Sequence, residues 1–143
     1  MALSADTPRT YADNIAPEFA SLPCTSAATI YEGSAVAEST TAGTVKALAA
    51  SDTVFWGFCH QKVVNASGGS SRCTVRTQGV AVLTVAGASG VTDNGVAVYA
   101  SDDGTFTLTS TSTYVLIGYV QRWVTSTTCE VYFKANYKRP AHV

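Results

Sequence analysis

Apolar and polar residues alternate along short runs in the second half of the chain, which is the pattern of half-buried β-strands. The clearest run is residues 78–87, where valines alternate with small residues. Turn signals follow at near-regular spacing, Asp-Asn-Gly at residues 93–95 and Asp-Asp-Gly at residues 102–104. Such turns between short β runs are typical of antiparallel sheets. The pattern therefore predicts an all-β fold, a small antiparallel β-barrel or β-sandwich.

The pattern divides the chain into three parts. Residues 72–134 form the centre of the predicted domain, and the residues before Arg72 look like an approach to it. We place the β-domain at residues 24–137 and a basic C-terminal tail at residues 138–143. Within the domain, a turn or bulge is expected at residues 32–33, and Gly57 is expected to mark a bulge or a close backbone approach.

Residues 1–23 predict an extended N-terminal arm. It contains three of the four prolines of the chain, at positions 8, 17 and 23, which argues against regular helix or sheet. Four apolar residues recur three to four positions apart and need a surface to pack against. They are the candidate partner-binding residues: Tyr11, Ile15, Phe19 and Leu22. The arm either folds back onto its own domain or reaches to a neighbouring subunit or another protein.

Composition limits the expected partners. Charged residues make up 13% of the chain and the net charge is −1, so no global field attracts nucleic acid or a membrane. We therefore expect neither as a partner. The N-terminus has no basic flank or apolar run of signal length, and we expect a protein made and used from the cytoplasm.

The sequence predicts no catalytic, metal-binding or cofactor-binding residue. Asp102 and Asp103 precede a glycine and are interpreted as turn residues and not as a metal or acid–base site, with Asp103 exposed. His60 follows Cys59 in a strand-like run, so the two side chains point to opposite faces and cannot form a nucleophile pair. The cysteines are widely spaced, which indicates free buried thiols and not a zinc site: Cys24, Cys59, Cys73 and Cys129.

Alternation places Arg72, Thr74 and Arg76 on one face of a strand. With Arg122 and the two tryptophans, these arginines are the ingredients of a single-strand nucleic-acid groove. A solvated sheet face, or a cross-strand pair with Glu130, is the interpretation we favour.

The order of motifs resembles that of the small capsid-cement, or head-decoration, proteins of tailed bacteriophages. The match covers roughly residues 26–134, and each motif is small-residue or turn chemistry. In chain order the motifs are Ile30-Tyr-Glu-Gly-Ser-Ala-Val36, Gly43-Thr-Val45, Phe55-Trp-Gly-Phe58, a strand pair over residues 75–83, Gly95-Val-Ala-Val-Tyr99, Asp103-Gly-Thr-Phe-Thr107, Ile117-Gly-Tyr-Val120 and a last strand over residues 129–133.

The resemblance implies a β-barrel or sandwich that forms a homotrimer on the outer surface of an icosahedral head. It implies the major capsid protein as partner, assembly in the host cytoplasm, and neither catalysis nor a cofactor. Such a protein bridges capsid subunits and stabilises the head.

Two other classes remain open. A receptor- or carbohydrate-binding domain of a tail fibre or baseplate needs exposed aromatic residues, and the candidates are Trp56, Tyr99, Tyr119 and Trp123. An enzyme, such as a peptidoglycan-degrading or nuclease domain, is disfavoured because no constellation of His, Asp and Glu is visible.

Overall fold

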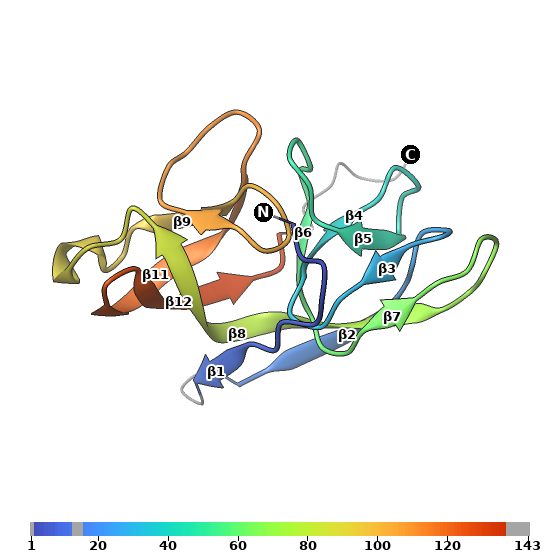
Figure 1. The fold of residues 1–143 in the computed structure, drawn as a ribbon, viewed down its shortest axis with the longest axis horizontal. Helices are drawn as coiled ribbons and strands as arrows, with labels where there is room; N and C mark the ends of the chain where they lie inside the picture. The colour runs from blue at the N-terminus through green and yellow to red at the C-terminus, as the bar shows by residue number, and fades with distance from the viewer. Residues whose placement is uncertain (1, 13–15, 137–143) are drawn as a thin grey trace.

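The computed structural model describes residues 2–12 and 16–136, and its regular structure is almost entirely β (Figure 1). Within this part of the chain the helical structure is one 3-10 turn, Val91–Asp93. The all-β prediction is therefore confirmed. Ile15 and the predicted tail, residues 138–143, lie outside the described residues.

The strands, in chain order, are β1 (Thr10–Ala12), β2 (Glu18–Pro23), β3 (Thr29–Ile30), β4 (Ala35–Glu38), β5 (Val45–Ala47), β6 (Phe55–Cys59), β7 (Val63–Val64), β8 (Arg72–Ala86), β9 (Ala97–Ala100), β10 (Phe106–Thr107), β11 (Val115–Thr125) and β12 (Thr128–Lys134).

Five strands close into a barrel in the order β8, β12, β11, β9, β10, and β10 returns to β8. The closing contact between β10 and β8 is parallel, at Phe106 opposite Val85, and the other barrel pairs are antiparallel. Aromatic rings fill one end of the barrel. The ring of Phe133 lies 4.8 Å from that of Phe58, edge to face, a geometry that aromatic pairs prefer.

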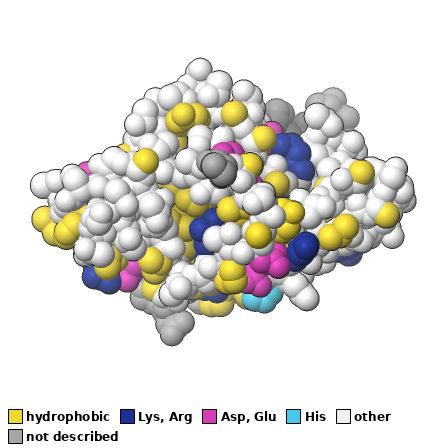
Figure 2. Space-filling model, in the orientation of Figure 1, with side chains coloured by type: hydrophobic (Ala, Val, Ile, Leu, Met, Phe, Trp, Pro, Cys, Tyr) yellow, Lys and Arg dark blue, Asp and Glu magenta, His cyan; other side chains and the backbone are white. Residues whose placement is uncertain are grey.

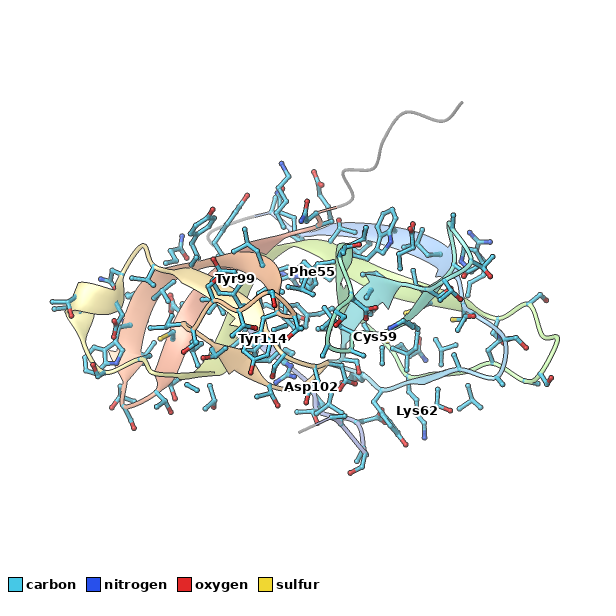
Figure 3. The ribbon with its side chains drawn as sticks, turned by 90° about the horizontal axis from the view of Figure 1, so that it is seen from above. Phe55, Cys59, Lys62, Tyr99, Asp102 and Tyr114 are labelled. Carbon is cyan, nitrogen blue, oxygen red and sulfur yellow. The ribbon has the colours of Figure 1, made fainter. Side chains whose placement is uncertain are left out.

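The barrel forms one lobe of the molecule. A second, smaller core lies in the other lobe, on the right of Figure 1, where β6, β4 and β5 continue the sheet beyond β8. Its buried residues are aliphatic side chains and thiols: Cys24, Ile30, Val36, Val45, Cys59, Cys73 and Val75. The expectation that residues before Arg72 merely approach the domain is wrong. They build this lobe, and Phe55 and Phe58 enter the barrel core (Figure 3 shows Phe55 inside).

β8 runs for 15 residues and serves both cores because its side-chain alternation slips by one residue near the middle. Arg76 pairs with Phe58 and Gly79 pairs with Phe133, and both phenylalanines lie in the barrel core. Residues three apart face opposite sides of a regular strand, so a slip separates them. The pairing of β2 with β8 shifts register at the same place. The prediction of two paired strands within residues 75–83 is therefore wrong, because the single strand β8 covers all of these residues.

The N-terminal arm lies on its own chain. β1 pairs with one edge of β8, where Tyr11 lies opposite Ala81. β12 pairs with the other edge of β8, where Val131 lies opposite Ala81. β1 is thus an outer strand at the edge of β8 opposite β12, and β2 pairs with the first half of β8. The expectation that prolines exclude sheet is wrong for Glu18–Pro23. Cys24 donates its N–H to Ser71, so the nitrogen of Pro23 faces away from β8 and no ladder bond is lost.

Polar contacts fix the start of the arm across the turn at residues 32–34. Thr7 N–H donates to the carbonyl of Glu32, at 2.8 Å, and Leu3 N–H donates to Asp103, at 3.0 Å. Ser34 Oγ donates to the second carboxylate oxygen of Asp103. Asp103 is 3% exposed, so its interpretation as an exposed turn residue is wrong. Its carboxylate joins three segments that the sequence does not show to be adjacent.

Candidate interaction surface

The structure separates the four predicted partner-binding residues. Tyr11 packs, half-buried, against the barrel core, and Leu22 packs against the second core. Phe19 is 49% exposed, and Ile15 lies outside the described residues. Of the three that are described, Phe19 alone presents a largely open ring to solvent.

Phe19 is held by its neighbours. The imidazole of His60 lies edge-on to its ring, with centroids 5.1 Å apart. Arg76, directly opposite Phe19 on β8, lies 5.9 Å from the same ring and 3.7 Å from the ring of Tyr11. A cation over an aromatic face is attracted to it by the ring quadrupole. Phe19 therefore sits in a fixed stack that includes two basic side chains.

A hollow of about 230 Å³ opens between the arm and β6, and we call it the arm hollow. Its lining residues are Arg9, Tyr11, Glu32, Cys59, His60 and Arg76. Figure 2 shows basic, acidic and histidine side chains close together in the lower middle of the molecule.

Arg9 and Arg76 close the end of the barrel core with charged groups. The guanidinium of Arg9 lies 5.3 Å from the ring of Phe106, and its Nε donates to the carbonyl of Gly33 at 2.8 Å. Arg9 Nη2 and Arg76 Nε are buried and have no hydrogen-bond acceptor among the described residues. Two donors of the hollow are thus left without acceptors, and buried donors without acceptors are costly.

Burial shifts the pKa values of two residues that line the hollow, Arg9 and Tyr11. It lowers the pKa of Arg9, against the effects of Tyr11 and Asp103, but an arginine keeps its charge in proteins. Burial also raises the pKa of Tyr11 to about 12, although Arg76 and Arg9 act in the opposite direction. The hollow at neutral pH therefore combines two guanidinium cations with a neutral phenol.

The basic residues of β8 extend this surface. Arg72, Thr74 and Arg76 share one face, as predicted, opposite Pro23, Ser21 and Phe19 of β2 in that order. A second hollow, of about 410 Å³, follows along Thr74, Arg72 and Lys62. Lys62 projects away from the ribbon in Figure 3. We call the outward side chains of Phe19, His60, Lys62, Arg72, Thr74 and Arg76 the basic face.

Arg122 does not join the basic face. It lies on β11 directly opposite Glu130, and its Nη2 donates to the Glu130 carboxylate at 2.6 Å. This confirms the cross-strand pair that we favoured, and the patch of three arginines does not form.

The four cysteines are free and buried, as predicted. Cys59 and His60 lie on opposite sides, one buried and the other exposed, so they form no nucleophile pair. The thiol of Cys73 lies 3.5 Å from Cys59 Sγ and donates to it, which lowers the pKa of Cys59. Burial raises the pKa of Cys24 and Cys129.

An aromatic pair marks the outside of the barrel. Tyr119 is 49% exposed and lies opposite Tyr132 on the neighbouring strand. Both line a small apolar hollow of about 100 Å³ together with Leu116 and Lys134. The other three candidate aromatic residues are half-buried, and Trp123 donates its indole N–H to the carbonyl of Ser126.

Sequence reasoning missed Arg9 and Glu32. Arg9 is the one Lys or Arg in residues 1–23, and a lone cation within an apolar arm is a signal that could have indicated it. Nothing local marks Glu32, which the fold brings to the arm through Asp6 and Thr7.

No family model and no curated protein matches this chain. Among the described residues, no group of three or more His, Cys, Asp and Glu side chains is placed to hold a metal ion. The same part of the chain has no helix with the length and apolarity needed to cross a membrane.

Proposed function

We propose that this protein is a structural virion protein, an outer capsid decoration (cement) protein that binds major capsid protein subunits and stabilises a phage head. The order of its turn and strand motifs, which resembles that family, supports this proposal. The barrel is one of the two folds that the resemblance implies. Its place is the outer capsid surface, after assembly in the host cytoplasm.

The observation that supports the proposal most is the fixed presentation of Phe19. Phe19 lies beside Arg76, and aromatic and arginine side chains are residue types that are enriched in protein–protein interfaces. The arm that holds Phe19 is paired to β8, so little conformational freedom is lost when a partner binds. A preformed contact of this kind suits a clamp, which acts through buried area and not through chemistry.

A trimer is part of the proposal. Three copies around a threefold position bind three equivalent sites at once, so weak individual contacts gain strongly from avidity. Sedimentation of the purified protein tests this part separately, and a monomer at micromolar concentration contradicts it.

The central test is binding to purified phage heads that lack decoration protein. We expect the wild type to bind, and Phe19→Ala to reduce affinity by about 10-fold or more, since such anchors are binding hot spots. Tyr119→Ala is the matched control, because Phe19 and Tyr119 are both 49% exposed. It should bind heads like the wild type. A wild-type protein that does not bind heads contradicts the proposed function.

A carbohydrate- or receptor-binding role is the second candidate, and the pair Tyr119 and Tyr132 favours it. Sugar rings stack on exposed aromatic faces, and these two side chains border an apolar hollow on the barrel. The same two variants separate the functions. Loss of binding to host-surface polysaccharide in Tyr119→Ala, with full binding in Phe19→Ala, supports this second role.

A further inference from the structure

Of the seven described lysine and arginine residues, six fall into two groups, and the seventh, Lys134, lines the apolar hollow of the barrel. Two make ion pairs: Lys46 with Asp52, and Arg122 with Glu130, both at 2.6 Å. Four others, all at the arm hollow or the basic face, form no ion pair with a described carboxylate: Arg9, Lys62, Arg72 and Arg76. Positive charge is therefore concentrated on one side of the molecule, although the whole chain has a net charge of −1.

Aromatic rings hold three of these four cations in place. Arg76 lies over Tyr11, Arg9 over Phe106, and the ammonium of Lys62 lies 5.3 Å from the ring of Tyr31. A guanidinium stacked on a ring keeps its N–H groups in its own plane, so they stay free for a planar acceptor. Carboxylates accept such donors in pairs.

We propose that the arm hollow and the basic face bind an extended acidic segment of a partner protein. One carboxylate enters the arm hollow, which Arg9 and Arg76 line, and accepts from their guanidinium groups. A second carboxylate is bound by Arg72 and Lys62 along the adjoining hollow. Under the proposed function this segment belongs to the capsid subunit, and that identity is the part of the inference that rests on the proposed function.

The spacing of the arginines defines the segment. Arg72 and Arg76 lie four residues apart on one strand, which is roughly 13 Å at the rise of a β-strand. An extended peptide with acidic residues four positions apart has the same spacing. We therefore expect recognition of Glu-x-x-x-Glu in extended form.

A peptide fits this surface better than single-stranded nucleic acid does. Nucleic-acid grooves need several free aromatic faces in succession for base stacking, whereas here Arg76 covers Tyr11 and leaves Phe19 as a single half-exposed ring. Glu32 also lines the hollow. A phosphate backbone has a charge at every nucleotide and cannot avoid Glu32, while a peptide can place a neutral residue there.

The test uses a synthetic peptide with glutamates four positions apart, the same peptide with glutamines, and an oligo-dT of similar length. Binding is measured by titration calorimetry at two salt concentrations. We expect the glutamate peptide alone to bind, and to bind more weakly at higher salt. Lys62→Gln/Arg72→Gln should weaken it about fivefold or more. Arg76→Lys, which keeps the charge but loses the planar fork, should also weaken it.

The matched control is Arg122→Gln/Lys134→Gln, which removes the same charge from the barrel and should leave peptide binding unchanged. Equal binding of the glutamine peptide, equal loss in this control, or preference for oligo-dT overturns the inference. Thermal melts of each variant confirm folding.

Head binding separates the two proposals. If the wild type binds the glutamate peptide but no heads, the proposed function fails and the acidic-segment site stands. If the wild type binds heads and Lys62→Gln/Arg72→Gln binds them equally well, with no peptide binding, the acidic-segment site is wrong and the proposed function stands.

Discussion

Buried and outward side chains alternate in the same way in the two halves of β8, but the surroundings of the two halves differ. In residues 72–76, Cys73 and Val75 face a small core of aliphatic groups and thiols, and the other face bears Arg72 and Arg76. In residues 79–86, the inward side chains belong to the barrel core. One slip between the halves makes the difference. The face that enters the barrel core continues past the slip as the basic face, so charged groups stack on the last aromatic rings.

The comparison predicts that truncating a buried side chain lowers the free energy of unfolding by different amounts in the two cores. Phe133→Ala should lower the free energy of unfolding by about 4 kcal/mol, because its ring contacts Phe55, Phe58 and Tyr11. Val75→Ala, in the second core, should cost about 2 kcal/mol. Urea unfolding measures both. Each variant should show one transition, since β8 belongs to both lobes, and two separate transitions would show that the lobes unfold independently.

Asp103 joins the lobes to the arm and gives the next largest effect. Asp103→Ala leaves the buried Ser34 hydroxyl and the Leu3 N–H without their acceptor, and should cost about 3 kcal/mol. The control is Asp93→Ala, whose carboxylate accepts only from Ser89 and Gly90 in its own loop among the described contacts. It should cost about 1 kcal/mol or less. Equal melting temperatures for the two variants contradict the role of Asp103.

The sequence predicted the fold class because alternation and turn residues are local signals. Gly57 was expected to mark a bulge or a close backbone approach, and both occur. The pairing of β4 with β6 shifts register beside Gly57, and a Cβ there would lie 2.0 Å from the carbonyl oxygen of Arg76. The slip in β8 could not be predicted, because both halves alternate correctly by themselves. The burial of Asp103 was missed for a similar reason: its partners Leu3 and Ser34 are distant in the chain.

The candidate surface was predicted in part. Phe19 and the shared face of Arg72 and Arg76 followed from spacing and alternation. The arm hollow did not, since it forms only when the arm lies across the turn at residues 32–34 and brings Arg9 beside Arg76. Long-range packing, and not local pattern, creates the site.

Two glycines with the same backbone conformation test how tightly the arm is held. Gly33 and Gly43 have φ of 84° and 85°, so alanine strains both by about 1–2 kcal/mol. At Gly33 the added Cβ would lie 1.7 Å from the carbonyl oxygen of Thr7, whereas at Gly43 nothing lies within 4 Å. Displacing the arm removes the bonds of Thr7 and Arg9, so Gly33→Ala should cost about 2 kcal/mol more than Gly43→Ala. Equal costs in urea unfolding would mean that the arm detaches freely.

The smallest effect concerns thiol reactivity and sharpens the contrast between the cores. The second core holds Cys59, whose pKa is lowered because the thiol of Cys73 donates to it. The barrel holds Cys129, whose pKa is raised by burial. A lower pKa gives a larger thiolate fraction at pH 8, and the thiolate is the form that alkylates. Cys59 should therefore be labelled by iodoacetamide before Cys129 in the native protein. Mass spectrometry of timed samples measures the order, and denatured protein without reductant should label all four cysteines, since they are free.

Cys73→Ala removes the donated hydrogen bond and should slow the labelling of Cys59 while leaving the labelling of Cys129 unchanged. Labelling of Cys129 before Cys59, or two thiols that stay unlabelled after denaturation, contradicts this account of the second core.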